Sequence, residues 1–295
     1  MADGPRVTLL GTGTMGVGMA HSLLRAGLPT TVWNRHIERA RPLADDGATV
    51  AGSIADAVRS ADVVVTMLFD ADSVGAVVEE AAPDLPDHAV WVQSSTVGRD
   101  GIASLARLAD EHGIALVDAP VVGTRQPAEE GALVVLASGP SDARERARPV
   151  LAAVGSRTVD LGDEVGAASA MKLVANAWVA SITTAAAQSI ALARGFGLDP
   201  ADFLATAKGG VADSGYLQLK GGAMLEARFD PQFALDGLLK DLRLVQGAAG
   251  DAKVPTVLAD ALVAAFERSS DAGHGGQDIA AVLAAFEPER VPQAP

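Results

Sequence analysis

The chain has 295 residues, 49% of them apolar, and a formal net charge of -14. Its length predicts about two domains, and its apolar content is sufficient for a large core. The acidic balance argues against nucleic acid and anionic membrane surfaces as partners, because both attract clustered lysine and arginine. The chain contains no cysteine. Disulfides, thiolate metal sites and a cysteine nucleophile are therefore excluded, and we predict no metal site.

No N-terminal segment has the charge and hydropathy pattern of a signal peptide. The most apolar stretch, residues 173–192, approaches the length of a membrane span, but polar residues such as Asn176 and Gln188 interrupt it. We therefore expect a cytoplasmic protein with no membrane partner.

The first half of the chain alternates short apolar runs with helical patterns. The apolar runs predict strands at 6–10, 30–33, 63–68, 89–93, 115–117 and 133–137. Helical spacing is present at 19–26, 37–46 and 99–111. Strands separated by helices predict βαβ units and a parallel sheet that is buried on both faces. We predict an α/β domain over residues 1–163, a Rossmann-type doubly wound parallel sheet that binds a nucleotide.

After Gly162 the strand patterns stop. Residues 167–194 contain neither proline nor glycine, and Gly195 and Gly197 follow. This pattern predicts one long helix of about 40 Å that ends at the glycines. Further helices are predicted at 200–208, 236–249, 255–269 and 278–286. We therefore expect an all-α domain over 164–290 and a short tail at 291–295.

A glycine-rich turn follows the first predicted strand and opens a helical pattern. It consists of Gly11, Thr12, Gly13, Thr14, Met15 and Gly16. Gly11 permits the tight turn, Gly13 lets the backbone approach a pyrophosphate, and Gly16 lets helix and strand pack closely. The N–H groups at the start of the helix attract phosphate. A glycine pattern alone can be only a loop, but in this context it predicts a dinucleotide site.

The end of the second predicted strand distinguishes NAD from NADP. An acidic residue there would bind the 2′-hydroxyl of NAD, but Asn34, Arg35 and His36 carry no carboxylate. Arg35 and Arg39 can form charge-assisted hydrogen bonds to a 2′-phosphate, although solvated surface arginines are the alternative. We predict NADP as the cofactor.

Two further strand ends are expected to line the nucleotide groove, because ligands bind at the carboxyl edge of such sheets. One contributes Met67, Leu68 and Phe69, and the other contributes Ser95 and Thr96. The two hydroxyls suit the nicotinamide ribose, but the same residues could equally be a helix cap.

Lys172 and Asn176 are four residues apart at the start of the long helix, so they share one helix face. Their neighbours are apolar or small. Burying an ammonium in such surroundings is costly unless the lysine has a partner or a chemical task. A desolvated lysine has a lowered pKa and can transfer a proton near neutral pH. A structural lysine paired at an interface is the alternative.

Several ordered motifs, spread over nearly the whole chain, resemble the β-hydroxyacid dehydrogenase family. This family includes 3-hydroxyisobutyrate dehydrogenase and glyoxylate/succinic semialdehyde reductase. The resemblance rests on the glycine turn, on Asp118-Ala119-Pro120-Val121-Val122-Gly123-Thr124, on Gly166, Ala168, Lys172 and Asn176, and on Lys240-Asp241-Leu242. Residues 123–131 are similar to the glyoxylate/succinic semialdehyde reductase branch.

The resemblance implies that Lys172 is the general acid that protonates the carbonyl oxygen, and that Asn176 orients the substrate. It also implies a homodimer or a dimer-based oligomer, although the apolar helices fit a monomer core equally well. The implied substrate site comprises Ser95, Val122, Gly123, Thr124, Lys172, Asn176, Trp178, Phe233, Lys240 and Asp241, with Lys240 also beside the cofactor.

The chain departs from the family pattern where the substrate is expected. Val122 replaces the usual serine, Thr124 replaces the second glycine, and Ala168 replaces a helix glycine. Loss of a polar pocket group weakens selection for a substrate that needs it. Arg125 could bind a distal carboxylate or could be a surface residue. Small aldehyde or keto acids are the leading substrates, and bulkier or less polar carbonyls stay open.

The sequence therefore predicts an NADP-dependent oxidoreductase that transfers hydride between NADPH and a small aldehyde or keto acid. An imine reductase is the first alternative: Val122 and Trp178 suit it, whereas Lys172 argues against it. A non-catalytic NADP-binding protein is the second. A decarboxylase like 6-phosphogluconate dehydrogenase is disfavoured because the chain is too short for its larger helical domain.

Overall fold

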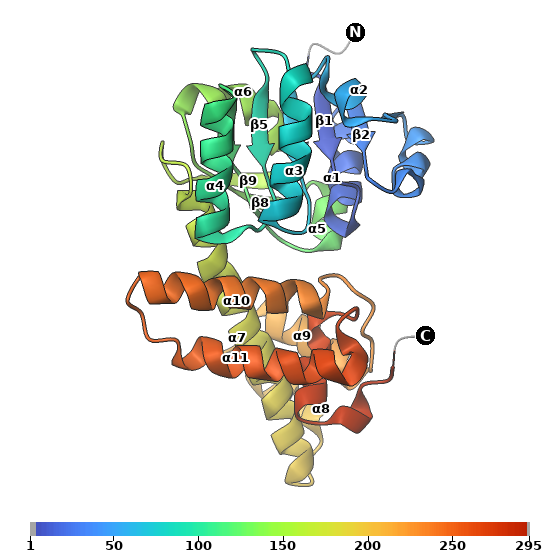
Figure 1. Ribbon diagram of the computed structural model, residues 1–295. Helices are drawn as coiled ribbons and strands as arrows, with labels where there is room; N and C mark the ends of the chain where they lie inside the picture. Colours follow the sequence, from blue (N-terminus) through green and yellow to red (C-terminus); the bar gives the residue numbers. More distant parts are fainter. Residues whose placement is uncertain (1–3, 294–295) are drawn as a thin grey trace. The chain divides into compact units, whose positions relative to one another are not determined.

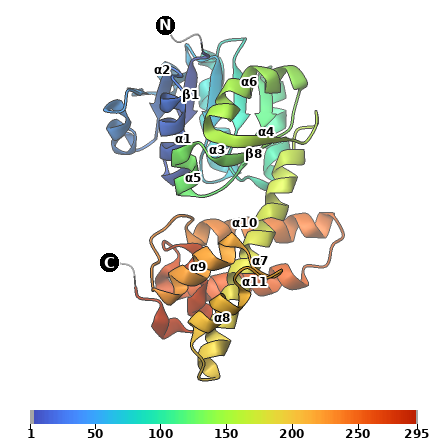
Figure 2. The same cartoon turned by 180° about the vertical axis from the view of Figure 1, so that it is seen from behind.

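The computed structural model describes residues 4–293 and divides the chain into two compact units, Met1–Lys172 and Leu173–Pro295. Figures 1 and 2 show the units from opposite sides. The division falls within helix α7 (Ala167–Gly195), which contributes its first residues to one unit and the rest to the other.

The first unit contains a six-stranded parallel sheet with the order β3-β2-β1-β4-β5-β6. Its strands are β1 (Val7–Leu10), β2 (Thr30–Trp33), β3 (Thr49–Val50), β4 (Val63–Thr66), β5 (Val90–Gln93) and β6 (Ala115–Asp118). This order is that of a doubly wound dinucleotide-binding sheet, so the predicted fold class is confirmed. The strand predicted over 63–68 ends at Thr66, because the Leu68 N–H donates to the Ser95 hydroxyl at 2.8 Å instead of to a strand.

A second sheet of three strands lies in the same unit, with the order β7-β8-β9. It consists of β7 (Val121–Val122), β8 (Leu133–Ala137) and β9 (Gly155–Asp160). The predicted strand over 133–137 therefore forms, but in this separate sheet. The sequence did not indicate β7, which is only two residues long, or β9, whose sequence is largely polar.

Helices cover both faces of the six-stranded sheet. They are α1 (Thr14–Arg25), α2 (Ile54–Val58), α3 (Ala71–Ala81), α4 (Gly98–Glu111), α5 (Arg125–Glu130) and α6 (Ser141–Val154), with the short turn η3 (Ala82–Asp84) after α3. Successive strand residues point to opposite faces. Leu9 therefore packs in a cluster with residues of α1 and α6, whereas Leu10 packs with residues of α2 and α3. Figure 1 shows α3 and α4 on the near face, and Figure 2 shows α6 on the other.

The helix predicted over 37–46 is wrong in detail. The segment forms two short 3-10 turns, η1 (Ile37–Arg39) and η2 (Arg41–Ala44). Pro42 lies in the first turn of η2 and has no N–H to continue an α-helical ladder.

The described residues of the second unit form helices joined by loops, and no β-strand is assigned among them. After α7 come α8 (Pro200–Ala207), α9 (Gly215–Leu225), α10 (Leu235–Asp251) and α11 (Val257–Ser269), then η4 (Ser270–His274), η5 (Ile279–Ala285) and η6 (Pro288–Arg290). The expected helical second half is confirmed. Helix α9 was not predicted, and the helix expected over 278–286 is the 3-10 helix η5.

The core of the second unit gathers apolar residues of α7, α10, α11 and η5, with Phe266 fully buried among them. Of the predicted tail, Val291 is buried against this core, and residues 294–295 lie outside the described part of the chain. None of the helices among residues 4–293 combines the length and the hydropathy needed to cross a bilayer.

Candidate functional site

The glycine turn connects β1 to α1 at the carboxyl edge of the six-stranded sheet. Gly11 has a φ of +112°, and a Cβ there would lie 2.3 Å from the Met67 carbonyl oxygen. A Cβ at Gly16 would lie 2.0 Å from the Gly11 carbonyl oxygen. The protein itself therefore requires glycine at both positions. At Gly13, by contrast, a Cβ would meet nothing within 4 Å, so the space beside it is open.

Two further features fit this turn to a nucleotide pyrophosphate. Helix α1 starts at Thr14, and its N-cap Gly13 provides no side-chain hydrogen bond to the first N–H groups. Such a helix start attracts phosphate oxygens. The Thr12 hydroxyl is buried and has no hydrogen-bond partner among the described residues. The turn therefore fits a dinucleotide: it offers open space at Gly13, and it offers hydrogen-bond donors from the uncapped helix start and the Thr12 hydroxyl.

Asn34 fixes the glycine turn to the end of β2. Its Oδ1 accepts a hydrogen bond from the Thr12 N–H at 3.2 Å, and its Nδ2 donates to the His36 carbonyl at 2.9 Å. Asn34 thus has a structural task that the sequence did not reveal. The side chains of Arg35, His36 and Arg39 are exposed at the same strand end.

Ser95 joins two neighbouring strand ends of this edge. Its hydroxyl is buried and accepts from the Leu68 N–H, and its backbone N–H donates to the Gln93 side chain at 2.7 Å. Thr96 and Met67 are half-buried beside these turns, and Phe69 is 60% exposed. The predicted cofactor residues of the first unit therefore share one edge, with Ser95 serving as a connector between loops.

The turn after β7 has a backbone conformation that favours glycine. Gly123 has a φ of +142° and is exposed, and Val122 and Thr124 on either side are half-buried. Arg125 begins α5, where its Nε pairs with Glu129 at 2.8 Å on the same exposed helix surface. This pairing supports the surface interpretation of Arg125.

Lys172 is buried, with 6% of its surface exposed, and it is the last residue of the first unit. The carboxylate of Asp118, at the end of β6, holds the turn of α7 that precedes it. This carboxylate accepts hydrogen bonds from the backbone N–H and the hydroxyl of Ser169, both at 2.8 Å. Burial raises the pKa of Asp118, and these donors oppose the shift. Sequence patterns do not reveal this contact, because its partners are 51 positions apart in the chain.

In the second unit, Asp241 connects two predicted site residues. Its Oδ2 accepts from the Asn176 Nδ2 at 2.6 Å, and its Oδ1 lies 2.7 Å from the Lys240 Nζ. Asn176 and Asp241 are buried, and Lys240 is half-buried. Asp241 was predicted to contact substrate; the structure shows that it holds the amide of Asn176 and the ammonium of Lys240.

The remaining predicted substrate residues of the second unit lie in different surroundings. Trp178, on α7, is 65% exposed. Phe233 is half-buried against the helical core, and its N–H lies 3.3 Å from an oxygen of Asp278. Lys172 is the last residue of the first unit, and Asn176 belongs to the second. Both lie on α7, four positions apart in the sequence.

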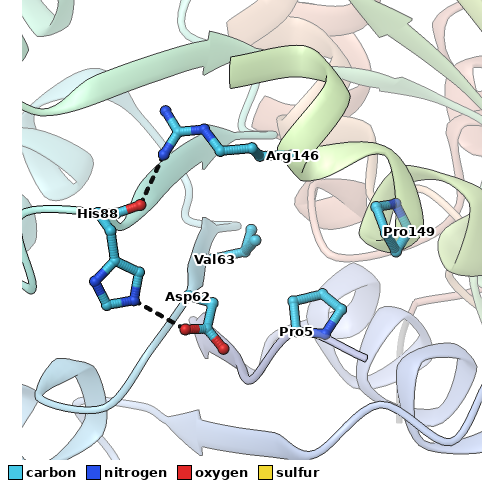
Figure 3. Close-up of a pocket in the computed structure, with 6 residues that line it drawn as sticks. All are labelled: Pro5, Asp62, Val63, His88, Arg146 and Pro149. Carbon is cyan, nitrogen blue, oxygen red and sulfur yellow. Dashed lines mark hydrogen bonds and ion pairs between the residues drawn. The ribbon is translucent and has the colours of Figure 1, made fainter. Parts of the chain in front are cut away.

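A cavity of about 280 Å³ lies at the opposite, amino edge of the sheet (Figure 3). It is lined by Pro5, Asp62, Val63, His88, Arg146 and Pro149. Asp62 accepts from Arg6 at 3.0 Å and pairs with His88 at 2.9 Å, and Arg146 donates to the His88 carbonyl at 2.8 Å. The hydrogen bond from Arg6 holds the pKa of Asp62 well below its usual range. These polar groups satisfy one another, so the cavity is a structural feature and not a candidate site.

Among the described residues, no three histidine, aspartate or glutamate side chains are grouped so that they could hold a metal ion.

Two family descriptions match successive parts of the chain. Residues 6–162 match the NAD binding domain of 6-phosphogluconate dehydrogenase, and residues 166–286 match the NAD-binding domain of NADP-dependent 3-hydroxyisobutyrate dehydrogenase. Glyoxylate/succinic semialdehyde reductase 2 of Arabidopsis thaliana is 31% identical over 284 residues, which cover 95% of this chain and 79% of that protein.

Solved structures agree with this assignment. The 3-hydroxyisobutyrate dehydrogenase of Salmonella typhimurium superposes with a TM-score of 0.88 at 29% identity, covering 95% of this chain and 99% of the other. An imine reductase of Myxococcus stipitatus in complex with NADP+ has a TM-score of 0.62 at 25% identity, covering 96% of this chain and all of the other. With the nucleotide turn and both domains matched, the chain belongs to the β-hydroxyacid dehydrogenase family of NAD(P)-dependent oxidoreductases.

Proposed function

We propose that the protein is an NADPH-dependent reductase of small aldehyde or keto acids, with Lys172 as its general acid. The observation that carries the proposal is the burial of Lys172 on α7, four residues before Asn176, in a chain with a glycine turn that fits a dinucleotide. The neighbours of Lys172 on α7 are small or apolar, and a buried ammonium in such surroundings needs a partner or a chemical task. Named relatives that reduce succinic semialdehyde or glyoxylate, or oxidise 3-hydroxyisobutyrate, support the substrate class.

The reaction places different demands on each residue. The nicotinamide, when bound, supplies the hydride for the carbonyl carbon. The Lys172 Nζ donates a proton to the carbonyl oxygen as negative charge develops there. Asn176 orients the substrate; its Nδ2 is held by Asp241, which leaves the amide oxygen directed away from that carboxylate. Lys240, paired with the same carboxylate, adds positive charge for an acidic substrate.

The proposal is tested by steady-state rates with NADPH on succinic semialdehyde, glyoxylate and a cyclic imine. We expect turnover of the two aldehydo acids. Replacement of Lys172 by alanine should lower kcat by about two orders of magnitude or more, because the lysine acts in the transition state. Its NADPH affinity, measured by fluorescence titration, should stay near that of the wild type. Parallel losses of turnover and of NADPH binding would indicate a structural lysine.

The preference for NADP rests on Arg35 and Arg39, exposed at the end of β2. Arg35→Asp places a carboxylate where a 2′-phosphate would bind, so the ratio of kcat/KM for NADPH to that for NADH should fall about tenfold or more. Arg59→Asp, at the end of α2, makes the same charge change and should leave the ratio unaltered. An unchanged ratio in the Arg35 variant would remove this residue from the phosphate site.

An imine reductase is the alternative that one observation favours. Val122 is half-buried and brings no hydroxyl to the pocket, which suits a less polar C=N substrate. The assignment to aldehydo acids fails if only the cyclic imine is reduced and if Lys172→Ala leaves that rate unchanged. NADPH binding without any turnover would instead indicate a non-catalytic nucleotide-binding protein.

We also propose that the protein is a homodimer or a dimer-based oligomer. Large apolar side chains are exposed in the second unit, which is costly for a monomer in water. They include Val174, Trp178, Leu192, Phe196, Leu198, Leu219, Val254, Val257 and Leu258.

A further inference from the structure

Asp118 is a fully buried carboxylate that the proposed chemistry does not use. It ends β6, where its backbone N–H and carbonyl pair with Ser138 at 3.0 and 2.9 Å. These two backbone bonds fix the residue between the ends of β6 and β8. The side chain is buried, and its hydrogen bonds indicate what it does.

The carboxylate closes the first turn of α7 from outside the helix. Its Oδ2 accepts from the N–H of Ser169 at 2.8 Å and from the N–H of Gly166 at 3.1 Å, and its Oδ1 accepts from the Ser169 hydroxyl at 2.8 Å. The Ser138 hydroxyl lies 3.5 Å from Oδ2 and accepts from the Ala168 N–H at 3.1 Å.

These contacts replace the cap that α7 does not provide for itself. The residue before the helix is Gly166, which has no side chain and a φ of +104°. The first N–H groups of a helix need acceptors, and a carboxylate there is favoured by the helix dipole. The ends of β6 and β8 supply these acceptors, so the start of α7 is anchored to the sheets of the first unit.

The anchored turn leads directly to the proposed general acid. Lys172 follows Ser169 by three residues, and residues at this spacing are neighbours on a helix surface. A helix transmits a displacement of its first turn to the next, and an error of about 1 Å in a reacting group can cost about a hundredfold in rate.

We propose that Asp118 is a positioning residue for the reaction: through Gly166 and Ser169 it fixes the start of α7 and thereby the place from which Lys172 delivers its proton. This inference rests on the proposed function, because it assumes that Lys172 is the general acid. Asp118 itself does not touch the substrate.

The first measurement is single-turnover oxidation of bound NADPH by an aldehydo acid, in the full-length wild type and in Asp118→Asn. The asparagine keeps the shape of the side chain but loses the charge and one acceptor. We expect the rate constant to fall about tenfold or more, with the amplitude for each bound NADPH unchanged. Asp199→Asn, which removes a carboxylate cap from α8, is the matched control and should leave the rate constant unaltered.

If Asp118 only stabilised the fold, Asp118→Asn should lower the amplitude and leave the rate constant unchanged. Misfolding of part of the sample lowers the amplitude, because fewer molecules react, but the molecules that stay folded react at the wild-type rate. A reduced amplitude with an unchanged rate constant would therefore overturn the proposal. If Asp118→Asn yields no folded protein, Ser169→Ala removes only the hydroxyl contact and should show a smaller loss of rate constant at full amplitude.

A double-mutant cycle tests whether Asp118 acts through Lys172. In the Lys172→Ala background, the Asp118→Asn substitution should change the residual rate by less than about twofold, because no lysine is left to position. Equal losses in both backgrounds would show that Asp118 acts independently, and the inference would be abandoned.

Amide hydrogen exchange gives a readout that does not need activity. The N–H groups of Ala168 and Ser169 should exchange faster in Asp118→Asn, because their first-turn contacts are weakened. Unchanged exchange in an active enzyme removes this inference alone. A wild type that oxidises no NADPH with any carbonyl substrate refutes the proposed function, and the positioning role falls with it.

Discussion

Gly11 and Gly13 lie in the same turn, but the absence of a side chain has a different reason at each position. Gly11 needs a positive φ and approaches the Met67 carbonyl, so its lack of a side chain serves the protein. Gly13 has a φ of -79°, which any residue adopts, and its surroundings are open. A side chain at Gly13 would meet nothing of the protein within 4 Å, and we expect that it would meet the pyrophosphate of a bound nucleotide. The folded protein itself does not require glycine at this position, so we attribute the glycine to the bound nucleotide.

Gly13→Ala is expected to separate binding from folding. Its free energy of unfolding, from urea denaturation, should stay within about 1 kcal/mol of the wild type, because an N-cap change and the lower entropy of the unfolded chain are both small. NADPH affinity should fall about tenfold or more, because the backbone can no longer approach the phosphates. Gly11→Ala is the matched comparison and should lose stability through backbone strain. Wild-type NADPH affinity in Gly13→Ala would place the pyrophosphate elsewhere.

Sequence patterns indicate candidate residues that lie near one another in the chain, but they do not show contacts between distant residues. The glycine turn and the pair Lys172 and Asn176 are local patterns, so spacing alone reveals them. Asp118 and Asp241 act on residues that are 51 and 65 positions away. No periodicity encodes such contacts, and only the folded chain shows that these two carboxylates hold the residues that the motifs had indicated.

At the scale of elements, the predicted strands were located well because each is a compact apolar run between turns. Helix α9 was missed because its glycines resemble a loop. A Cβ at Gly221 would lie 2.7 Å from a methyl group of Leu204, so this glycine allows α8 and α9 to approach closely. Glycine in a helix costs stability locally, and here tertiary packing accounts for its presence.

The helix α9 also carries one half of a buried ion pair that holds the second unit together. The Lys220 Nζ lies 2.7 Å from the Asp278 Oδ1, and both side chains are only 4% exposed. Asp278 additionally accepts from the N–H groups of Gln232, at 3.1 Å, and Ala280, at 3.0 Å. This carboxylate therefore joins α9, the turn before α10 and the start of η5.

Lys220→Met should destabilise the protein by about 3–5 kcal/mol, because it leaves a buried carboxylate without its cation. Urea denaturation followed by circular dichroism measures the loss. Lys208→Met, at the exposed end of α8, is the control and should change the free energy of unfolding by less than about 0.5 kcal/mol. A loss for Lys220→Met as small as that of the control would mean that water or a rearranged side chain replaces the ammonium.

At the scale of the whole molecule, each unit has hydrophobic cores of its own. The clusters of the first unit gather around the six-stranded sheet, and that of the second gathers around α10, α11 and η5. The sequence predicts a boundary between residues 163 and 164, because strand patterns stop after Gly162, whereas the compact units divide after Lys172 within α7. It could not indicate whether the apolar helices are buried within one chain or between two, because both arrangements select the same residues.

The exposed apolar surface supports the proposed oligomer. Trp178 and Val174 lie on one face of α7 and are 65% and 64% exposed. Contact of such apolar side chains with water is energetically unfavourable. A partner chain that covers them would remove this cost. Protein–protein interfaces depend on a few large anchor residues, among which tryptophan, tyrosine and arginine are enriched.

Trp178→Glu should therefore dissociate the proposed dimer into monomers that stay folded. Sedimentation velocity at micromolar concentration should give a dimer for the wild type, twice the 29.9 kDa of one chain, and a monomer for the variant. Ala103→Glu, at an exposed position of α4, adds the same charge and should remain dimeric. Circular dichroism should be unchanged in both variants, because neither position lies in a core. A monomeric wild type would contradict the proposed assembly, and the exposed tryptophan would then be available to the substrate, as the resemblance implies for Trp178.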